Sequence, residues 1–198
     1  MQDARLKPCT AFEGHRRLSS GPLGDVAIAV KDAVGRGAPV PILIFDDATG
    51  QVIDIDLRGN ADAILARLSP VGREIEEPRG RGRPKLGVVA REVTLLPRHW
   101  DWLSTQPGGA SVALRKLVEE ARRANSIKDS KRETRERVYR FMSTMAGDLP
   151  AFEDAARALF ADDPARMERI IASWPSDIRE HIIKLAGPNA DHARAQAG

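Results

Sequence analysis

A basic stretch rich in proline and glycine divides the chain and constrains its fold more than any other feature. Residues 70–84 contain three prolines and three glycines among charged residues, and they show no repeating apolar pattern. A segment of this composition buries too little apolar surface to hold a helix or strand of its own. We therefore expect residues 71–85 to be a linker between two folded regions.

The residues before this linker predict a small ββαββα unit over residues 1–70, in a chain of the α+β class. Residues 40–45 form an apolar strand, and residues 51–57 alternate between apolar and polar side chains like a strand with one wet face. A first hairpin is expected near residues 10–18, and a breaker at residues 21–24. Helices are expected at about residues 25–34 and 61–68, the second capped by Asn60.

The residues after the linker predict a strand and then helices. A strand is expected at residues 86–96, a short helix from Pro97 to about residue 105, and a sharp break at residues 107–109. Ser111 is expected to cap a further helix that ends near residue 124, which completes a segment of residues 86–125. Residues 126–187 predict a separate helical module, and residues 188–198 a frayed tail.

The excess of positive charge lies in the middle third of the chain. Residues 71–140 contain 17 basic and 10 acidic side chains, whereas residues 1–70 contain 8 and 9, and residues 141–198 contain 6 and 9. A basic segment between acidic flanks is typical of a local binding site for a polyanion. The alternative is a solvated, charged helix.

Three features indicate a soluble protein of a reducing compartment. The longest apolar runs are too short to cross a bilayer. The N-terminus has no basic segment followed by an apolar one, so no secretory signal is expected. The single cysteine, Cys9, has no internal disulfide partner. We expect a cytoplasmic location, at the nucleoid if the chain binds DNA, and no membrane partner.

The Arg-Gly-Arg-Pro core at residues 81–84 resembles the AT-hook, a short motif that binds the DNA minor groove. Narrow AT-rich grooves have a strong negative potential that favours an inserted arginine, and Gly82 lets the backbone lie on the groove floor. The minor groove distinguishes A·T from G·C pairs and little more, so an AT preference without a unique site is expected. The expected minor-groove residues are Arg79, Arg81, Gly82, Arg83, Pro84 and Lys85. An ordinary basic linker is the alternative.

Residues 88–124 resemble the ribbon-helix-helix family of bacterial transcription factors. The likeness lies in the run from Arg91 to Pro97, in Trp100 and Leu103, and in residues 108–115. An isolated strand leaves its backbone groups unpaired, and pairing with the same strand of a second chain satisfies them by symmetry. The resemblance implies a homodimer whose ribbon enters the major groove and whose second helix begins at a DNA phosphate. The residues it implies are Arg91, Val93, Thr94 and Leu95 for the ribbon, and Gly109, Ala110, Ser111 and Arg115 for the phosphate.

Strand alternation leaves two registers open for this ribbon. If Leu96 points inward, Arg91, Val93 and Leu95 face outward; if Leu95 points inward, Glu92 and Thr94 do. The first register is preferred because Leu-Pro before the helix is the family's usual junction. Neither presents a polar triad for base reading, so the ribbon fits dimerisation better than recognition. The alternative is a strand that joins the N-terminal sheet.

Along its whole length the chain also resembles a bacterial family known only as a domain of unknown function, which implies a bacterial source and no activity. The leading hypothesis is a homodimeric, AT-preferring DNA-binding protein, either a transcriptional regulator or a nucleoid factor. Residues 1–70 or 126–187 would then serve a protein partner. The alternative is a dimeric protein-interaction or antitoxin-like adaptor that does not bind DNA.

No enzyme, cofactor or metal site is expected. Asp46, Asp47, Asp54 and Asp56 provide oxygen ligands near one hairpin, but the first two are also ordinary turn residues and the others lie on a wet strand face. The four histidines, at positions 15, 99, 181 and 192, have neither ligand spacing nor a triad motif. Cys9 lacks a neighbouring motif and is expected to be structural.

Overall fold

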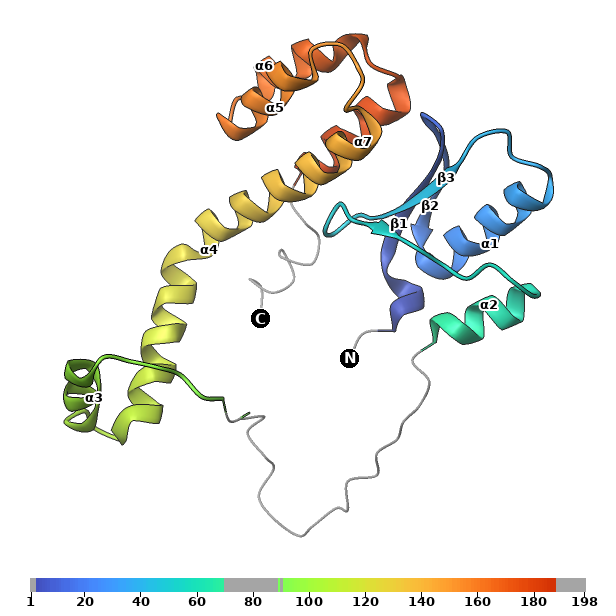
Figure 1. The fold of residues 1–198 in the computed structure, drawn as a ribbon. Helices are drawn as coiled ribbons and strands as arrows, with labels where there is room; N and C mark the ends of the chain where they lie inside the picture. The colour runs from blue at the N-terminus through green and yellow to red at the C-terminus, as the bar shows by residue number, and fades with distance from the viewer. Residues whose placement is uncertain (1–2, 70–88, 90, 188–198) are drawn as a thin grey trace. The chain divides into compact units, whose positions relative to one another are not determined.

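The computed structural model describes residues 3–69, 89 and 91–187 (Figure 1). The chain divides into two compact units. The first, here called the sheet unit, combines Met1–Val71 with Ser130–Gly198, and the second, the hairpin unit, is Gly72–Asp129. N-terminal and C-terminal segments that were expected to be separate therefore fold together in the sheet unit.

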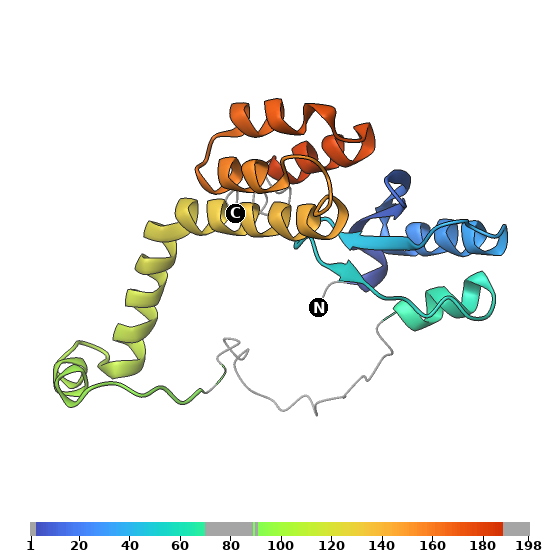
Figure 2. The ribbon, with the colours of Figure 1, turned by 45° about the horizontal axis from the view of Figure 1, so that its top comes forward.

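The sheet unit contains a four-stranded antiparallel sheet, which together with the helices confirms a mixed α+β fold (Figures 1 and 2). The strands are β1 (Pro8–Glu13), β2 (Arg16–Pro22), β3 (Ile42–Asp46) and β4 (Val52–Ile53), in the spatial order β2-β1-β3-β4. A short 3₁₀ turn, η1 (Ala4–Leu6), precedes them. β1 pairs with both β2 and β3, so it lies inside the sheet.

The expected breaker at residues 21–24 is wrong. β2 continues through Pro22, and helix α1 (Leu23–Gly35) begins at the next residue. Proline is tolerated because β2 is an edge strand, and its outer side has no neighbouring strand. The missing N–H of Pro22 therefore need not remove a hydrogen bond between strands. Pro22 also takes the position just before the helix, where its fixed backbone angle costs nothing.

The two faces of the sheet pack against different helices because side chains alternate along each strand. On one face, Cys9, Ala11 and Ile44 pack with Leu23, Val26 and Val30 of α1. On the other face, Phe12 and Phe45 pack with the C-terminal helices. Helix α2 (Ala61–Leu68) follows the sheet, and the Asn60 side chain accepts a hydrogen bond of 2.9 Å from the Ala63 N–H, as predicted.

The strand expected at residues 51–57 is much shorter in the structure. Only Val52 and Ile53 pair with β3, although Ile53, Ile55 and Leu57 all lie partly buried against the α1 cluster. The alternation in the sequence therefore predicted correctly which side chains face the core. It did not predict how many residues form backbone hydrogen bonds, because these bonds need a paired strand alongside.

Four C-terminal segments and the end of α4 form the other half of the core. The segments are α5 (Phe152–Phe160), α6 (Pro164–Ile170), η2 (Ile171–Ser173) and α7 (Ser176–Ala186). Buried residues from them, among them Ile171, Ile178 and Ile182, join Phe141 and Met142 of α4 in one cluster with Phe12 and Phe45. The phenyl rings of Phe12, Phe45 and Phe141 contact one another, with centroids 4.9–6.1 Å apart.

Helix α4 (Gly109–Met145) corrects the helix boundaries expected from the sequence. It begins at Gly109, before the expected cap Ser111, and it continues past residue 124 through the charged stretch as one helix of 37 residues. Glu119 pairs with Arg122 and Arg123, and Glu136 pairs with Arg140, at the i,i+3 and i,i+4 spacings that support an exposed helix. Within the described residues, no helix has the length and apolar character needed to span a membrane.

The hairpin unit consists of α3 (Pro97–Ser104), a tight turn and the first part of α4. Gly108 and Gly109 both adopt positive φ angles, 84° and 76°. Two consecutive residues in this region reverse the chain within a few residues, and glycine adopts the conformation without a Cβ penalty. Leu103 and Ala113, on either side of this turn, are the buried apolar residues of this unit in the described part of the chain.

Candidate functional site

The hairpin unit contains all of the residues that the sequence predicts for DNA contact. The minor-groove residues Arg79, Arg81, Gly82, Arg83, Pro84 and Lys85 lie outside the described residues. The ribbon and phosphate residues are described. The ribbon residues come directly before α3, and the phosphate residues lie at the start of α4.

The ribbon residues form an extended segment before α3 that belongs to no strand. Residues 91–96 are not part of any of the four strands β1–β4. Arg91, Val93 and Thr94 are exposed, Leu95 is partly buried and Leu96 is 49% exposed. Both registers remain predictions, because a register is defined only against a paired strand.

The predicted phosphate residues lie in the first turns of α4. Gly109 opens the helix, Ala110 and Ser111 follow within its first turn, and Arg115 lies one turn later. The first N–H groups of any helix lack an intrahelical acceptor, which suits an anion. The Arg115 side chain donates a hydrogen bond of 3.1 Å to the Ser111 carbonyl oxygen, so its guanidinium lies back along the helix toward that turn.

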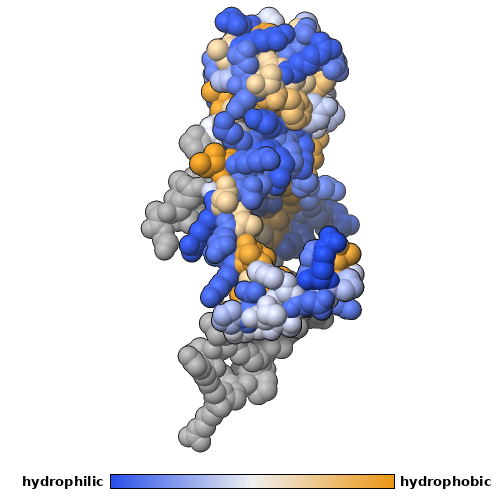
Figure 3. All heavy atoms as spheres, turned by 90° about the vertical axis from the view of Figure 1, so that its left-hand side faces the viewer, coloured by the Kyte–Doolittle hydropathy of each residue, from blue (hydrophilic) through white to orange (hydrophobic). Residues whose placement is uncertain are grey.

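The hairpin unit exposes most of its large apolar side chains. In Figure 3, which views the molecule from the side of α3 in Figure 1, hydrophobic residues lie on the surface between hydrophilic ones. Exposed fractions range from 41% for Trp100 to 72% for Ile127, and the set is Val89, Val93, Leu96, Trp100, Trp102, Leu117, Val118 and Ile127. Among the described residues of the unit, Leu103 and Ala113 are the buried apolar ones, and an exposed apolar set of this size marks a surface that a partner can cover.

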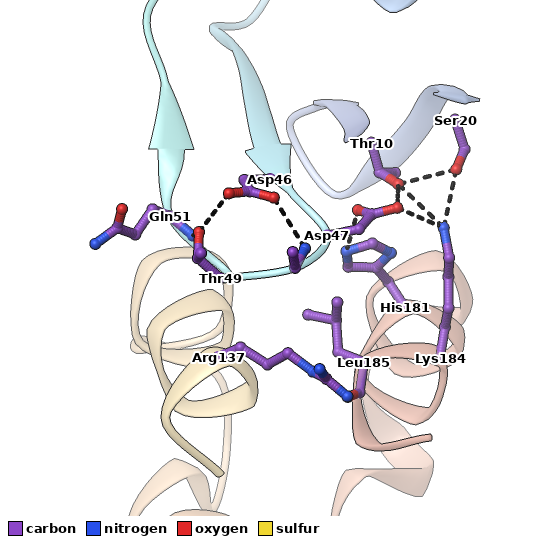
Figure 4. A network of polar contacts seen from close by, with 11 residues as sticks. Thr10, Ser20, Asp46, Asp47, Thr49, Gln51, Arg137, His181, Lys184 and Leu185 are labelled. Atoms are coloured by element: carbon purple, nitrogen blue, oxygen red, sulfur yellow. Dashed lines mark hydrogen bonds and ion pairs between the residues drawn. The ribbon is translucent and has the colours of Figure 1, made fainter. Parts of the chain in front are cut away.

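A second cluster of polar side chains lies inside the sheet unit, between the sheet and α7 (Figure 4). Lys184 of α7 donates hydrogen bonds to Asp47, at 2.7 Å, and to Ser20, at 3.1 Å. The Thr10 hydroxyl lies 2.9 Å from Ser20 and donates to Asp47 at 3.1 Å. The His181 Nε2 atom lies 3.6 Å from the Asp47 carboxylate. The cluster joins β1, β2 and the β3–β4 turn to α7.

This cluster lacks the geometry of a hydrolytic triad. A triad needs a hydroxyl bonded to the imidazole, but here Thr10 and Ser20 contact Asp47 and Lys184. Both imidazole nitrogens of His181 are buried without a hydrogen-bond partner in the described structure. The His181 ring instead packs on Phe12 and Phe141, with centroids 5.2 and 4.5 Å away. These five residues, Thr10, Ser20, Asp47, His181 and Lys184, tie the sheet to α7 and are here called the clamp.

Stability is expected to decrease as the pH falls from about 6.5 to about 4, because of His181. Burial lowers its pKa from 6.5 to about 4, against the opposing effect of Asp47 and with help from Lys184 and Arg17. Between these pH values the His181 imidazole binds a proton in the unfolded chain but not in the folded chain. The free energy of unfolding therefore decreases by roughly 3 kcal/mol across this window and changes little below it. Urea unfolding at a series of pH values measures the decrease.

The matched comparison uses His181→Phe, which keeps a ring between Phe12 and Phe141 and removes the titrating group. Its unfolding free energy should depend less on pH than that of the wild type between about 6.5 and 4. The control is His15→Phe, because His15 is exposed and lies in the same unit. Equal slopes for wild type and His181→Phe would contradict the role assigned to His181.

Arg137 of α4 secures the end of α7. Its side chain is almost fully buried and donates hydrogen bonds to the carbonyl oxygens of Leu185, at 2.7 Å, and Gly187, at 2.6 Å. The last carbonyls of a helix lack intrahelical donors, and a guanidinium satisfies two of them at once. Burial lowers the pKa of Arg137, but an arginine remains charged at neutral pH.

The aspartates of the β3–β4 region do not converge on a metal site. Asp46 pairs with Lys7 at 2.8 Å and accepts from the Thr49 hydroxyl at 2.7 Å, whereas Asp56 pairs with Arg58 at 2.8 Å. Within the described residues, no three histidine, cysteine or acidic side chains are grouped to hold a metal ion. Cys9 is fully buried, and burial raises the pKa of its thiol to about 12, which keeps it protonated at neutral pH.

The contact of Asp47 with α7 was missed at the level of sequence, although one signal was present. His181 and Lys184 are three residues apart, a spacing that places both on one face of a helix. Nothing local connects that face to a turn more than 130 residues earlier.

Comparison with known proteins gives one match. A family described as "uncharacterized protein conserved in bacteria" matches residues 8–186, which covers most of both units. No curated protein and no solved structure matches the chain.

Proposed function

The chain belongs to this bacterial family, DUF2239, and we propose that it is a homodimeric DNA-binding protein with a preference for AT-rich duplexes. The observation that carries the proposal is the hairpin unit, which combines exposed apolar side chains with an extended segment outside the sheet. It lies in the part of the chain where basic residues outnumber acidic ones by 17 to 10, residues 71–140.

A second copy of the chain satisfies both needs of the hairpin unit. Two extended segments at residues 91–96 pair with each other in antiparallel fashion about a twofold axis, and each supplies the strand that the other lacks. The same contact covers the apolar side chains of α3 and α4, such as Trp102 and Val118, which are 50% and 64% exposed in the single chain.

The dimer then brings two copies of the basic Arg79–Lys85 segment onto one duplex. Each arginine-rich segment enters a narrow AT-rich minor groove, and the start of each α4 contacts phosphate. Two linked weak sites bind more tightly than either alone because the second binding step is intramolecular. The ribbon serves mainly to dimerise, since its outward residues include Val93 and Leu95 in the preferred register.

Fluorescence anisotropy of labelled duplexes tests the DNA proposal. AT-rich and GC-rich duplexes of equal length are titrated with the full chain from about 50 to about 200 mM salt. Tighter binding to the AT-rich duplex, with an affinity that falls steeply as salt rises, is expected because the contacts are to phosphate and groove. A stable dimer that binds neither duplex would instead favour the second candidate, a protein-interaction adaptor.

The dimer itself is expected to dissociate when Val118 is replaced by glutamate. Val118 is 64% exposed in the single chain, and the substitution places a charge in the proposed apolar contact on both copies. Two buried valines lost at about 1.5 kcal/mol each weaken the dimer at least about 100-fold. Sedimentation equilibrium measures this, with Ser126→Glu as the control, because Ser126 belongs to the same helix but, nine residues after Leu117, lies on the opposite side of it. An unchanged dimer in Val118→Glu would exclude this surface.

A further inference from the structure

Strand β4 forms one edge of the sheet, and in the described part of the chain no strand covers its outer side. The Asp46 N–H donates to the Gln51 carbonyl at 2.9 Å, and Ile53 lies opposite Ile44 in the same ladder. Hydrogen-bonded pairs alternate along an antiparallel ladder, so Gln51 and Ile53 point their backbone groups toward β3. The N–H and C=O groups of Val52, between them, therefore point away from β3, toward the open edge.

The same alternation continues in the extended residues after β4. Asp54 and Asp56 follow Val52 at intervals of two, so their backbone groups point to the same side. The Asp56 carbonyl accepts a hydrogen bond of 2.8 Å from the Arg67 side chain, so helix α2 covers the edge at that position. The backbone groups of Asp54 have no hydrogen-bond partner among the described residues. An added strand therefore finds free donors and acceptors at Val52 and Asp54.

A groove of about 380 Å³ lies beside this edge. The Arg140 side chain donates a hydrogen bond of 3.1 Å to the Thr49 carbonyl, which holds α4 to the turn before β4 and keeps the groove open in the free protein. The Val52 side chain is 46% exposed and lies on the same sheet face as its cross-strand neighbour Phe45. The groove is lined by Gly50, Gln51 and Val52 and, from α4, by Arg140, Ser143 and Thr144.

The polar groups of the groove are engaged within the protein. The hydroxyls of Ser143 and Thr144 both donate to the Arg140 carbonyl, at 3.0 Å. The Arg140 guanidinium pairs with Glu136 at 3.2 Å, which balances its charge. A polar side chain placed in the groove would find no free partner there, so the groove favours a small apolar side chain such as valine.

Asp54 supplies an unbalanced charge beside the groove. It is exposed and takes part in no ion pair of the described residues, whereas Asp56 pairs with Arg58 at 2.8 Å. Opposite charges directly across two strands attract, so a basic residue in an added strand would pair with Asp54. A second copy of β4 brings another Asp54 and no cation. A charge on a short edge strand prevents such pairing of like edges, and here it also selects the partner.

We propose that the edge of β4 binds an extended segment of a partner protein, which adds to the sheet as a further antiparallel strand. The segment carries a basic residue and, two residues later, a valine or a residue of similar size. The basic residue lies opposite Asp54. The valine lies opposite Val52, exchanges backbone hydrogen bonds with it and places its side chain in the groove. The site belongs to the sheet unit alone, so it is independent of DNA binding and of the hairpin dimer.

The probe is the peptide acetyl-Ser-Thr-Arg-Thr-Val-Thr-Ser-amide, titrated into the full, isotope-labelled chain and followed by NMR. We expect a Kd on the order of 1 mM, with the largest shift changes at Val52, Asp54 and Thr144. Methylating the backbone nitrogen of the peptide's valine removes the donor to the Val52 carbonyl and should weaken binding at least about tenfold. Methylating the threonine just before it is the matched control. That N–H points away from β4, so the affinity should change less than about twofold.

Three variants of the protein assign the site. Asp54→Lys should weaken binding of the probe about five- to tenfold, and a probe with glutamate in place of arginine should bind this variant more tightly than it binds the wild type. Ser143→Leu should weaken binding of both probes by filling the groove, at a position that is exposed. Asp32→Lys makes the same charge change at an exposed residue of α1, outside the groove, and should leave both affinities unchanged.

Several outcomes would overturn the proposal. They are no binding of the probe at about ten times the expected Kd, equal loss from the two methylated peptides, and no exchange of charge preference in Asp54→Lys. A dimer that dissociates in Asp54→Lys but not in Asp32→Lys would show that a second copy occupies the edge instead. The comparison of the methylated peptides needs no protein variant, so it decides even if a variant fails to fold.

Discussion

Replacing Gly50 by alanine is expected to lower the free energy of unfolding of the sheet unit by more than about 3 kcal/mol. Gly50 lies in the β3–β4 turn at a φ angle of 69°, where alanine is strained. A Cβ atom there would lie 2.0 Å from the carbonyl oxygen of Arg137 and 2.8 Å from its carbonyl carbon. These are backbone atoms of α4, so the clash is relieved only by moving the turn away from the helix.

Urea unfolding measures the loss, and the chain contains a matched control. Gly37 has a similar φ angle of 79°, but a Cβ atom there would meet nothing within 4 Å. Gly37→Ala therefore suffers the conformational penalty alone, about 1–2 kcal/mol. The difference between the two variants isolates the contact of the turn with α4. If both variants lose the same stability, the turn does not pack on the helix as described.

Arg83→Ala is expected to weaken binding to an AT-rich duplex by about 10- to 100-fold and to have a much smaller effect on a GC-rich one. The prediction rests on the proposed function. An arginine inserted in a narrow minor groove gains from the stronger negative potential of AT-rich sequence, and the gain disappears with the side chain. The preference between the two duplexes should therefore fall along with the affinity.

Anisotropy titrations of both duplexes at one salt concentration measure this effect. Arg73→Ala is the control, because it removes the same charge from the same linker outside the Arg-Gly-Arg-Pro core. A basic linker that only attracts phosphate would lose the same modest affinity in both variants, on both duplexes. That result would mean that the linker attracts DNA phosphates but does not insert an arginine into the minor groove.

Features fixed by neighbouring residues were predicted well from the sequence. Helix α2 and its Asn60 cap follow from a side chain and an N–H group three residues apart. The apolar run that became β3 and the alternation of Ile53, Ile55 and Leu57 follow from the periods of the strand. Each depends on contacts within a few residues, which a local pattern records.

Features fixed by distant residues were not predicted. The sheet face that carries Phe12 and Phe45 must pack against another element, but no local pattern in the sequence identifies α7 as that element. The charged stretch after residue 124 was divided from the preceding helix, because its polarity indicates exposure and does not indicate where a helix ends. Ala113 is buried in the hairpin unit whereas Leu117 and Val118 are exposed, which reverses the expectation from hydrophobicity. The small side chain of Ala113 fits close to the turn, whereas the larger side chains of Leu117 and Val118 lie on the surface.

The discontinuity of the sheet unit has a consequence for the order of events during synthesis. Phe12 and Phe45 leave the ribosome early, but Ile178 and Ile182, which cover them, follow more than 130 residues later. At roughly 5–20 residues per second, the apolar face stays open for on the order of ten seconds. The hairpin unit, Gly72–Asp129, is complete before that closure. Nascent chains arrested before and after α7 should therefore differ sharply in protease resistance.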